Sequence, residues 1–271
     1  MPGLSTALAM LLAAHSLPTV SNPDSVPPTH DLDRLAGQTE TSDRMTIPAV
    51  VDGKGPFRFL VDTGSQRTVL SRSVADRLEL GRGPIVRVIS IAGTKEVSTA
   101  YVDQIAFGRQ SIGPLTVPLL DRAHIGADGI IGTDALQGQR VVFDFVRDTI
   151  TIGTPRELES TEEFEIVVRA RRREGRLILT NAMIDGVRTN VVIDTGAQGA
   201  IGNLALRRAL RGRSTGTGTL TSATGQVQPA DFRVAGELKL GTMRLGNVVI
   251  AFADGPAFTE LKLDKRPALF L

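Results

Sequence analysis

One short motif occurs twice in this chain. Val61-Asp62-Thr63-Gly64-Ser65 and Ile193-Asp194-Thr195-Gly196-Ala197 each place an aspartate after an apolar run and follow it with Thr-Gly. The two aspartates are 132 residues apart (194 − 62), and the surrounding sequence repeats with them. A single Asp-Thr-Gly would be ordinary turn chemistry, because Asp and Gly both favour turns. Two copies in matched surroundings predict a tandem pair of similar units that brings two carboxylates together.

The segments before and after each motif predict the same order of elements in both units. Each aspartate ends the second strand of a hairpin with an Asp-Gly turn, at Asp52-Gly53 and at Asp185-Gly186. Each motif is followed by a short strand, then by a residue typical of a helix N-cap and a short helix. The predicted elements are strands Met45 to Val51, Phe57 to Val61, Leu177 to Ile184 and Asn190 to Ile193, with helices from Ser71 to Leu80 and from Asn203 to Leu210.

Each unit also contains an alternating hairpin with glycine at its tip. The first has arms Ile85 to Ile91 and Val97 to Phe107, and the second covers Thr219 to Ala230. These hairpins are placed to fold over a bound peptide and exclude water. The candidate covering residues are Ala92, Gly93, Thr94, Thr224 and Gly225.

The first unit continues through the apolar run Gly129-Ile130-Ile131-Gly132 to Asp134, which we expect to be a helix N-cap. A hairpin over residues 141–152 closes the unit. Leu269 to Leu271 is the counterpart of Gly129 to Ile131, and there the given sequence ends. An apolar Leu-Phe-Leu end without a partner strand would be a poor terminus. We therefore expect the second unit to lack its final segment, and the sequence to be a fragment.

Composition leaves few candidates for catalysis besides carboxylates. The chain has no Cys, which excludes disulfides, thiolate metal sites and cysteine nucleophiles. Of three His, only His124 lies outside the leader region, in a segment that we expect to be a loop. No metal site or cofactor is therefore expected. A net charge of +2 is too small to indicate a nucleic-acid surface.

The N-terminus predicts export. Leu4 to Ala14 is apolar but too short to span a bilayer, which takes about 20 residues. It fits the apolar segment of a secretory signal, although a positively charged n-region is missing. We expect a periplasmic or secreted protein, with a cytoplasmic one as the alternative. The predicted organisation is a signal segment and linker over 1–43, a first lobe over 44–153, a linker over 154–163 and a second lobe over 164–271.

Two carboxylates held about 3 Å apart cannot both ionise, so they share one proton. One can then take a proton from water while the other donates a proton to a carbonyl, which hydrolyses a peptide bond without a metal. Gly64 and Gly196 permit turns whose N–H groups point at the aspartates. Thr63 and Thr195 have hydroxyls that could cross-brace the turns. Ser65 can add a hydrogen bond that Ala197 cannot.

The Asp-Thr-Gly-Ser/Ala motifs, the glycine-tipped hairpins and Ile130-Ile131-Gly132-x-Asp134 together resemble the retropepsin-like aspartic proteases. The resemblance implies an all-β, two-lobed acid-protease fold of two tandem β-barrel units. It implies that Asp62 and Asp194 form the catalytic dyad and that Thr63 and Thr195 interlock. It also implies that Ile130, Ile131 and Gly132 lie beneath the active turn. The two-copy chain is similar to bacterial members, and its lobes would form an internal pseudo-dimer acting on polypeptides.

Two other functions remain open. A peptide-binding module could keep this fold without turnover, since fold does not establish activity. A two-carboxylate glycosidase is less favoured, because sugar sites use stacking aromatics and this chain has no Trp and one Tyr, Tyr101.

Overall fold

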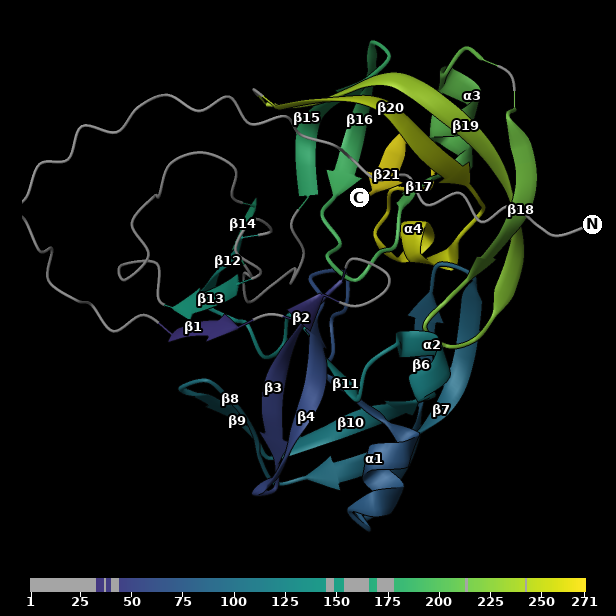
Figure 1. The fold of residues 1–271 in the computed structure, drawn as a ribbon. Coiled ribbons are helices and arrows are strands. Elements are labelled where there is room, and N and C mark those ends of the chain that lie inside the picture. Colours follow the sequence, from purple (N-terminus) through teal and green to yellow (C-terminus); the bar gives the residue numbers. More distant parts are fainter. Residues whose placement is uncertain are drawn as a thin grey trace, which may run out of the picture. The chain divides into compact units, whose positions relative to one another are not determined.

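The computed structural model describes residues 33–36, 38–39, 44–144, 149–153, 166–169, 178–212, 214–241 and 243–271 (Figure 1). The predicted signal segment (4–14) and the predicted linker over 154–163 lie outside these residues. In the described part of the chain, every helix is too short and too polar to cross a membrane.

The strands form three sheets. The first lobe is the sheet ordered β6-β7-β10-β5-β11-β4-β3-β8-β9, with β2 paired to β3, together with helices α1 and α2. Its elements are β2 (Gln38–Thr39), β3 (Met45–Val51), β4 (Lys54–Val61), β5 (Val69–Ser71), α1 (Arg72–Arg77), β6 (Arg82–Ser90), β7 (Gly93–Val102), β8 (Ile105–Phe107), β9 (Gln110–Ile112), β10 (Leu115–Leu120), α2 (Arg122–Ile125) and β11 (Gly129–Ile131).

The second lobe is the sheet ordered β15-β16-β21-β17-β20-β19-β18. Pairing of β15 with β19 closes six of these strands into a barrel. Its elements are β15 (Ile178–Ile184), β16 (Val187–Val192), β17 (Ala200–Gly202), α3 (Leu204–Ala209), β18 (Gly216–Thr221), β19 (Val227–Leu240), β20 (Met243–Phe252), α4 (Pro256–Glu260) and β21 (Ala268–Phe270).

A separate four-stranded sheet is ordered β1-β13-β12-β14. It consists of β1 (Asp33–Ala36), β12 (Arg140–Asp144), β13 (Thr149–Gly153) and β14 (Ile166–Arg169). The antiparallel β12–β13 pair confirms the hairpin predicted over residues 141–152. The all-β fold with two tandem lobes is also confirmed.

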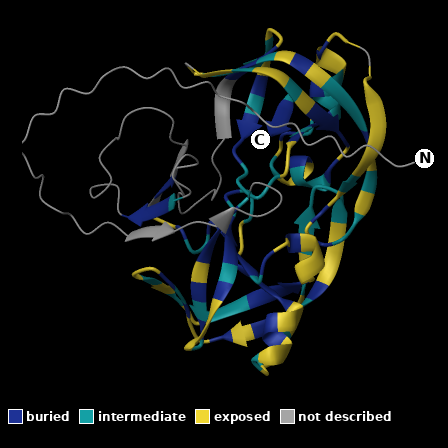
Figure 2. Ribbon diagram, in the orientation of Figure 1, coloured by how far each residue is buried: buried dark blue, intermediate teal, exposed yellow. Residues whose placement is uncertain are grey.

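Aliphatic side chains build the core. In β3, Met45, Ile47, Ala49 and Val51 are buried, and from Ile47 onward this burial alternates as expected for a strand with one face toward the core; Thr46 is buried as well (Figure 2). The main cluster of buried residues includes side chains from both lobes, among them Ile131, Val191 and Leu269. Burial of Val, Ile, Leu and Ala therefore supports a chain in which aromatics are only 4%.

The same turn closes the hairpin before each aspartate. Asp52 and Gly53 have φ of 47° and 74°, and Asp185 and Gly186 have φ of 46° and 81°. Positive φ at both central residues matches the right-handed twist of a hairpin, and the Asp-Gly pair tolerates it. The turn predicted from sequence is thus confirmed in both lobes.

Each aspartate follows the end of a strand that has a parallel neighbour. β11 pairs in parallel with β4 and antiparallel with β5. In the second lobe, β21 pairs in parallel with β16 and antiparallel with β17. The expectation that the Leu-Phe-Leu segment lacks a partner strand is therefore wrong, because β21 has a partner on each side.

Both helix caps are confirmed, but the helices are shorter than predicted. Ser71 Oγ accepts from the Val74 N–H, and Asn203 Oδ1 accepts from the Leu206 N–H. The first helix ends at Arg77 because Glu79 adopts a left-handed conformation, with φ of 54°. The Leu80 N–H then bonds to the Ala75 carbonyl, which is the hydrogen bond of a Schellman motif. Glu79 thus takes a left-handed position that more often holds glycine.

Three further predictions need correction. The arm predicted over Val97 to Phe107 is two strands, since β8 leaves β7 to pair with β3 and β9. His124 lies on the short helix α2 and not in a loop. Asp134 does not cap a helix, because it lies in a turn and accepts from Thr68.

Candidate active site

The two Asp-Thr-Gly turns meet with each glycine against the opposite carboxylate. A Cβ added to Gly64 would lie 2.3 Å from Cγ of Asp194, and one added to Gly196 would lie 2.4 Å from Cγ of Asp62. Real Cβ atoms do not approach so closely, so only glycine leaves room for the facing carboxylate. The lack of a side chain at these two positions is what brings Asp62 and Asp194 together.

Backbone N–H groups orient both carboxylates. Asp62 Oδ1 accepts from the N–H groups of Gly64 (2.8 Å) and Ser65 (3.0 Å), and Asp194 Oδ1 accepts from Gly196 (3.0 Å). The hydroxyl of Ser65 points elsewhere and donates to the Arg67 carbonyl at 2.8 Å. The two turns therefore differ little in side-chain contacts to the aspartates, although one carries Ser65 and the other Ala197.

Thr63 and Thr195 cross-brace the turns in a symmetric way. Thr63 Oγ1 donates to the Ile193 carbonyl (2.8 Å) and accepts from the Thr195 N–H (3.2 Å). Thr195 Oγ1 donates to the Val61 carbonyl (2.7 Å) and accepts from the Thr63 N–H (3.1 Å). Each hydroxyl thus binds the backbone of the other lobe twice, which holds the two aspartates at a set separation.

Burial raises the pKa of both aspartates. The pKa of Asp194 lies well above its ordinary value, first because of desolvation and then because of the charge of Asp62 and the hydrogen bond between the two carboxyls. Desolvation also raises the pKa of Asp62, against the hydrogen bond from Asp194, the Gly64 and Ser65 N–H groups and the positive charge of Arg44. This environment favours one proton shared by the pair.

The strand β11 beneath the first turn contains Ile130 and Ile131, and Gly132 follows it directly. The Ile131 carbonyl accepts from the Asp62 N–H at 3.0 Å. A Cβ at Gly132 would lie 2.5 Å from the carbonyl carbon of Arg67, so a side chain there would push the turn away. In the second lobe the Leu271 carbonyl accepts from the Asp194 N–H at 2.7 Å. Leu271 therefore supports the second turn, which sequence reasoning left unsupported.

Thr68 and Asp134 make a second support that sequence reasoning missed. Both Asp134 carboxylate oxygens accept from the Thr68 N–H, at 2.8 and 3.0 Å, and one accepts from the Thr68 hydroxyl at 2.7 Å. Thr68 Oγ1 in turn accepts from the Gly132 N–H. The pair joins the end of the Asp62 turn to the chain that leaves β11.

The predicted covering hairpins touch each other. The β6–β7 hairpin turns at Ile91 and Ala92, and the β18–β19 hairpin turns through residues 222–226. Gln226 Nε2 donates to the Thr94 carbonyl (3.1 Å), Lys95 Nζ donates to the Thr224 carbonyl (2.9 Å), and a Cβ at Gly93 would lie 2.5 Å from Gln226 Nε2. Gly225 packs against His124, because a Cβ added to Gly225 would lie 2.3 Å from His124 Nε2.

A cavity of about 510 Å³ adjoins the first turn. Its wall is mainly apolar and includes residues of both lobes. The cavity is lined by residues of the Asp62 turn (Gly64 and Ser65), of the rest of the first lobe (Val69, Val88 and Pro118) and of the second lobe (Val192, Leu261 and Phe270). Charged side chains of Arg67, Arg87 and Glu260 also line it. This space can hold a large side chain beside the carboxylates.

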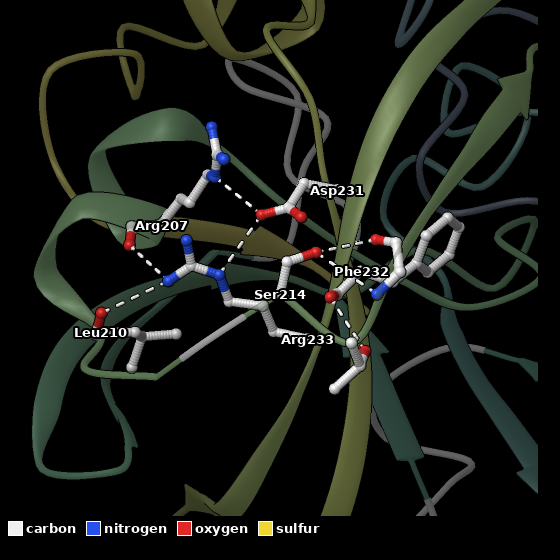
Figure 3. A network of polar contacts seen from close by, with 8 residues as sticks. Arg207, Leu210, Ser214, Asp231, Phe232 and Arg233 are labelled. Carbon is white, nitrogen blue, oxygen red and sulfur yellow. Dashed lines mark hydrogen bonds and ion pairs between the residues drawn. The ribbon is translucent and has the colours of Figure 1, made fainter.

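A polar network joins α3 to β19, the strand that leads away from the second hairpin tip (Figure 3). Asp231 Oδ2 accepts from Nε of Arg207 (2.8 Å) and of Arg233 (3.3 Å). Arg233 also donates to the carbonyls of Arg207 and Leu210. This network anchors the base of the hairpin to the helix that follows the second Asp-Thr-Gly turn.

No cluster of three His, Asp or Glu side chains in the described ranges is arranged to hold a metal ion. The polar groups described at the two turns are carboxylates, hydroxyls and backbone N–H and carbonyl groups.

Comparison with known proteins agrees with this geometry. A family model described as Aspartyl protease matches residues 47–135 and 180–265, which together make up more than half of the chain. The first segment contains the Asp62 turn and Ile130 to Gly132, and the second contains the Asp194 turn and the β18–β19 hairpin. No curated protein gave a significant match. With a family model that covers both Asp-Thr-Gly turns and most of both lobes, the chain belongs to the aspartyl protease family.

Proposed function

We propose that the chain is an aspartic-type endopeptidase that cleaves peptide bonds with a water molecule activated by Asp62 and Asp194. Family membership supports a protease in general. The observation that carries the finer proposal is the close approach of each turn glycine to the opposite carboxylate, which places two aspartates side by side. The covering hairpins and the adjoining cavity would bind an extended peptide across the pair.

The chemistry follows from one shared proton. Ionised Asp62 takes a proton from the water, and protonated Asp194 donates its proton to the oxygen of the scissile carbonyl. A tetrahedral diol forms as the water oxygen bonds to the carbonyl carbon. The diol then collapses: Asp62 donates the proton taken from water to the leaving nitrogen, Asp194 takes a proton from one diol hydroxyl as the carbonyl re-forms, and the C–N bond breaks, which restores the starting protonation of the pair. The two N–H groups on Asp62 Oδ1 hold that carboxylate in place for the first step.

The test is cleavage of a peptide library near pH 5 by the wild type and by Asp62→Asn and Asp194→Asn, with products identified by mass spectrometry. We expect each variant to lose on the order of 10³-fold or more in kcat/KM, because removal of a general acid or base costs about that much. EDTA should have no effect. A peptide-binding module would instead bind peptides in wild type and Asp62→Asn alike and cleave none.

We also propose that the protein is exported, from the apolar segment Leu4 to Ala14 and the small residues that end it. N-terminal sequencing of protein from each cell fraction tests this. Export predicts an extracytoplasmic protein that begins after Ala14, and an intact Met1 in the cytoplasmic fraction would contradict it.

A further inference from the structure

Arg44 stands opposite Asp62 on the sheet of the first lobe. The antiparallel β3–β4 ladder pairs Thr46 with Leu60. Continued by two residues in the same register, the ladder sets Arg44 across from Asp62. The residue is half-buried. Because an antiparallel register fixes which residues are opposite, the position of Arg44 beside the carboxylate follows from the strand that delivers that carboxylate.

The turn after α2 accommodates the guanidinium. A Cβ added to Gly126 would lie 2.5 Å from Nη2 of Arg44. Gly126 ends α2 in the left-handed conformation, with φ of 73°. The side chain therefore runs from the residue before β3 to the glycine that ends α2. Two elements on either side of the site thus determine where the charge is held.

The charge of Arg44 acts on both carboxylates. It lowers the pKa of Asp62 against the effect of burial, and both aspartates in turn favour the charged form of Arg44. Burial lowers the pKa of Arg44 itself, but a guanidinium remains protonated at any pH at which proteins fold. Arg44 is thus a permanent positive charge next to a pair that holds one negative charge.

Two other side chains on α2, the helix that ends at Gly126, make contacts of their own. On α2, Arg122 pairs with Asp128 at 2.8 Å, and His124 contacts Gly225 of the second hairpin. Desolvation and then Asp62 raise the pKa of Asp194, and the backbone N–H groups of its own turn lower it. The pKa of Asp62 is raised by desolvation and lowered by the hydrogen bond from Asp194, by the N–H groups of its turn and by the charge of Arg44. Arg67, Arg87 and Glu260 line the cavity that adjoins the turn, but Arg44 is the cation among the leading influences on the pKa of Asp62.

We propose that Arg44 is a positioning residue for the reaction, whose guanidinium, held between the start of β3 and the Gly126 turn, stabilises the singly ionised state of the Asp62–Asp194 pair. This inference rests on the proposed endopeptidase function. Without that charge, both proton losses from the pair become less favourable, so the active form with one proton exists at higher pH. The residue would thus set the pH range of activity without touching the substrate.

The experiment is the pH dependence of kcat/KM for wild type, Arg44→Met, Arg44→Lys and a control, Arg72→Met. Arg72 is on α1, where its guanidinium binds Ser98, so the control removes the same charge away from the pair. In Arg44→Met, we expect both limbs of the profile to move to higher pH. Its activity then falls below wild type on the acidic side and declines later on the basic side. Arg44→Lys and Arg72→Met should keep the wild-type limbs.

Two results would overturn the inference. Arg44→Met could lower kcat/KM equally at every pH with unmoved limbs, which indicates a purely structural role. Alternatively, Arg72→Met could shift the profile as much as Arg44→Met, which indicates an effect of net charge. Circular dichroism establishes that each variant is folded. Arg44→Gln, which keeps a polar group for the Gly126 turn, replaces Arg44→Met if the latter does not fold.

A second readout separates this inference from the proposed activity. Carbon-13 NMR of aspartate carboxyls, assigned with Asp62→Asn and Asp194→Asn, follows the titration of the pair without any substrate. We expect the pair to titrate at higher pH in Arg44→Met than in wild type. If wild type cleaves no peptide yet this shift occurs, the endopeptidase proposal fails and the role of Arg44 stands. If wild type cleaves peptides and no shift occurs, only the role of Arg44 fails.

Discussion

Replacing Thr63 by valine removes one hydroxyl from the contact between the two turns while keeping the shape of the side chain. Thr63 is 1% exposed. Its Oγ1 serves two groups of the second lobe, because it donates to the Ile193 carbonyl and accepts from the Thr195 N–H. Each buried group left without a partner costs about 1–3 kcal/mol. Thr63→Val leaves two such groups, so we expect it to lose about 2–6 kcal/mol of unfolding free energy, a large part of the roughly 5–15 kcal/mol of a typical domain.

Urea denaturation followed by circular dichroism measures this loss, and Thr189→Val is the matched control. Thr189 is also 1% exposed, but its hydroxyl makes one bond, to the Val187 carbonyl two residues away in β16. The control should lose about 0.5–1.5 kcal/mol. A double-mutant cycle with Thr195→Val should be non-additive by about 1 kcal/mol or more, because the two hydroxyls brace the same pair of turns.

The reasoning is refuted if Thr63→Val is no more costly than Thr189→Val, or if the cycle is additive. Either result would mean that the turns are held by strand packing and that the hydroxyl contacts contribute little.

Three further predictions follow from the site. Gly64→Ala and Gly196→Ala should each lower kcat/KM on the order of 10²-fold, because the added methyl group displaces the facing carboxylate from its alignment. The control Gly199→Ala, in the same loop as Gly196, should leave kcat/KM unchanged because a Cβ there meets open space. Because burial raises the pKa of Asp194, the folded state keeps its proton to higher pH than the unfolded state. Unfolding free energy should therefore fall as pH rises from about 4 through that raised pKa; in urea titrations Asp194→Asn should lack this fall, and a wild type that gains stability over the same range would contradict it. Gln226→Ala removes the bond to Thr94 at the hairpin contact, so hydrogen exchange should quicken at both tips and not in β12; equal protection in variant and wild type would argue against a contact in solution.

Local sequence patterns predicted most of the strands that deliver the aspartates. The strand predicted over Met45 to Val51 is β3, and Asp-Gly pairs marked turns with positive φ in both lobes. Ser71 and Asn203 cap helices, as expected of residues with a short polar side chain at that place. These features depend on neighbours in the chain, which is why they are readable without a structure.

Prediction failed where a distant residue decided the local conformation. Asp134 follows an apolar strand and precedes Ala135, which is typical of a helix start, yet Thr68 binds its carboxylate from the other end of the turn. Val97 to Phe107 has one alternating pattern, but β3 offers an edge to which β8 pairs. Leu271 carries no polar side chain, and its role in supporting Asp194 comes from a backbone carbonyl. Because every residue has a backbone carbonyl, the sequence does not indicate which carbonyl will accept a particular hydrogen bond.

The sequence by itself determined that two similar units each carry an aspartate in a Thr-Gly turn, and that Cys and His are too scarce to compete with them. The sequence also predicted that the two carboxylates come together, but the contacts that allow it, Gly64 against Asp194 and Gly196 against Asp62, and the place of Arg44 across from Asp62 required the tertiary structure. The physical reason is one of range. Turn and strand preferences act over a few residues, whereas the proximity of two carboxylates depends on packing between segments more than a hundred residues apart.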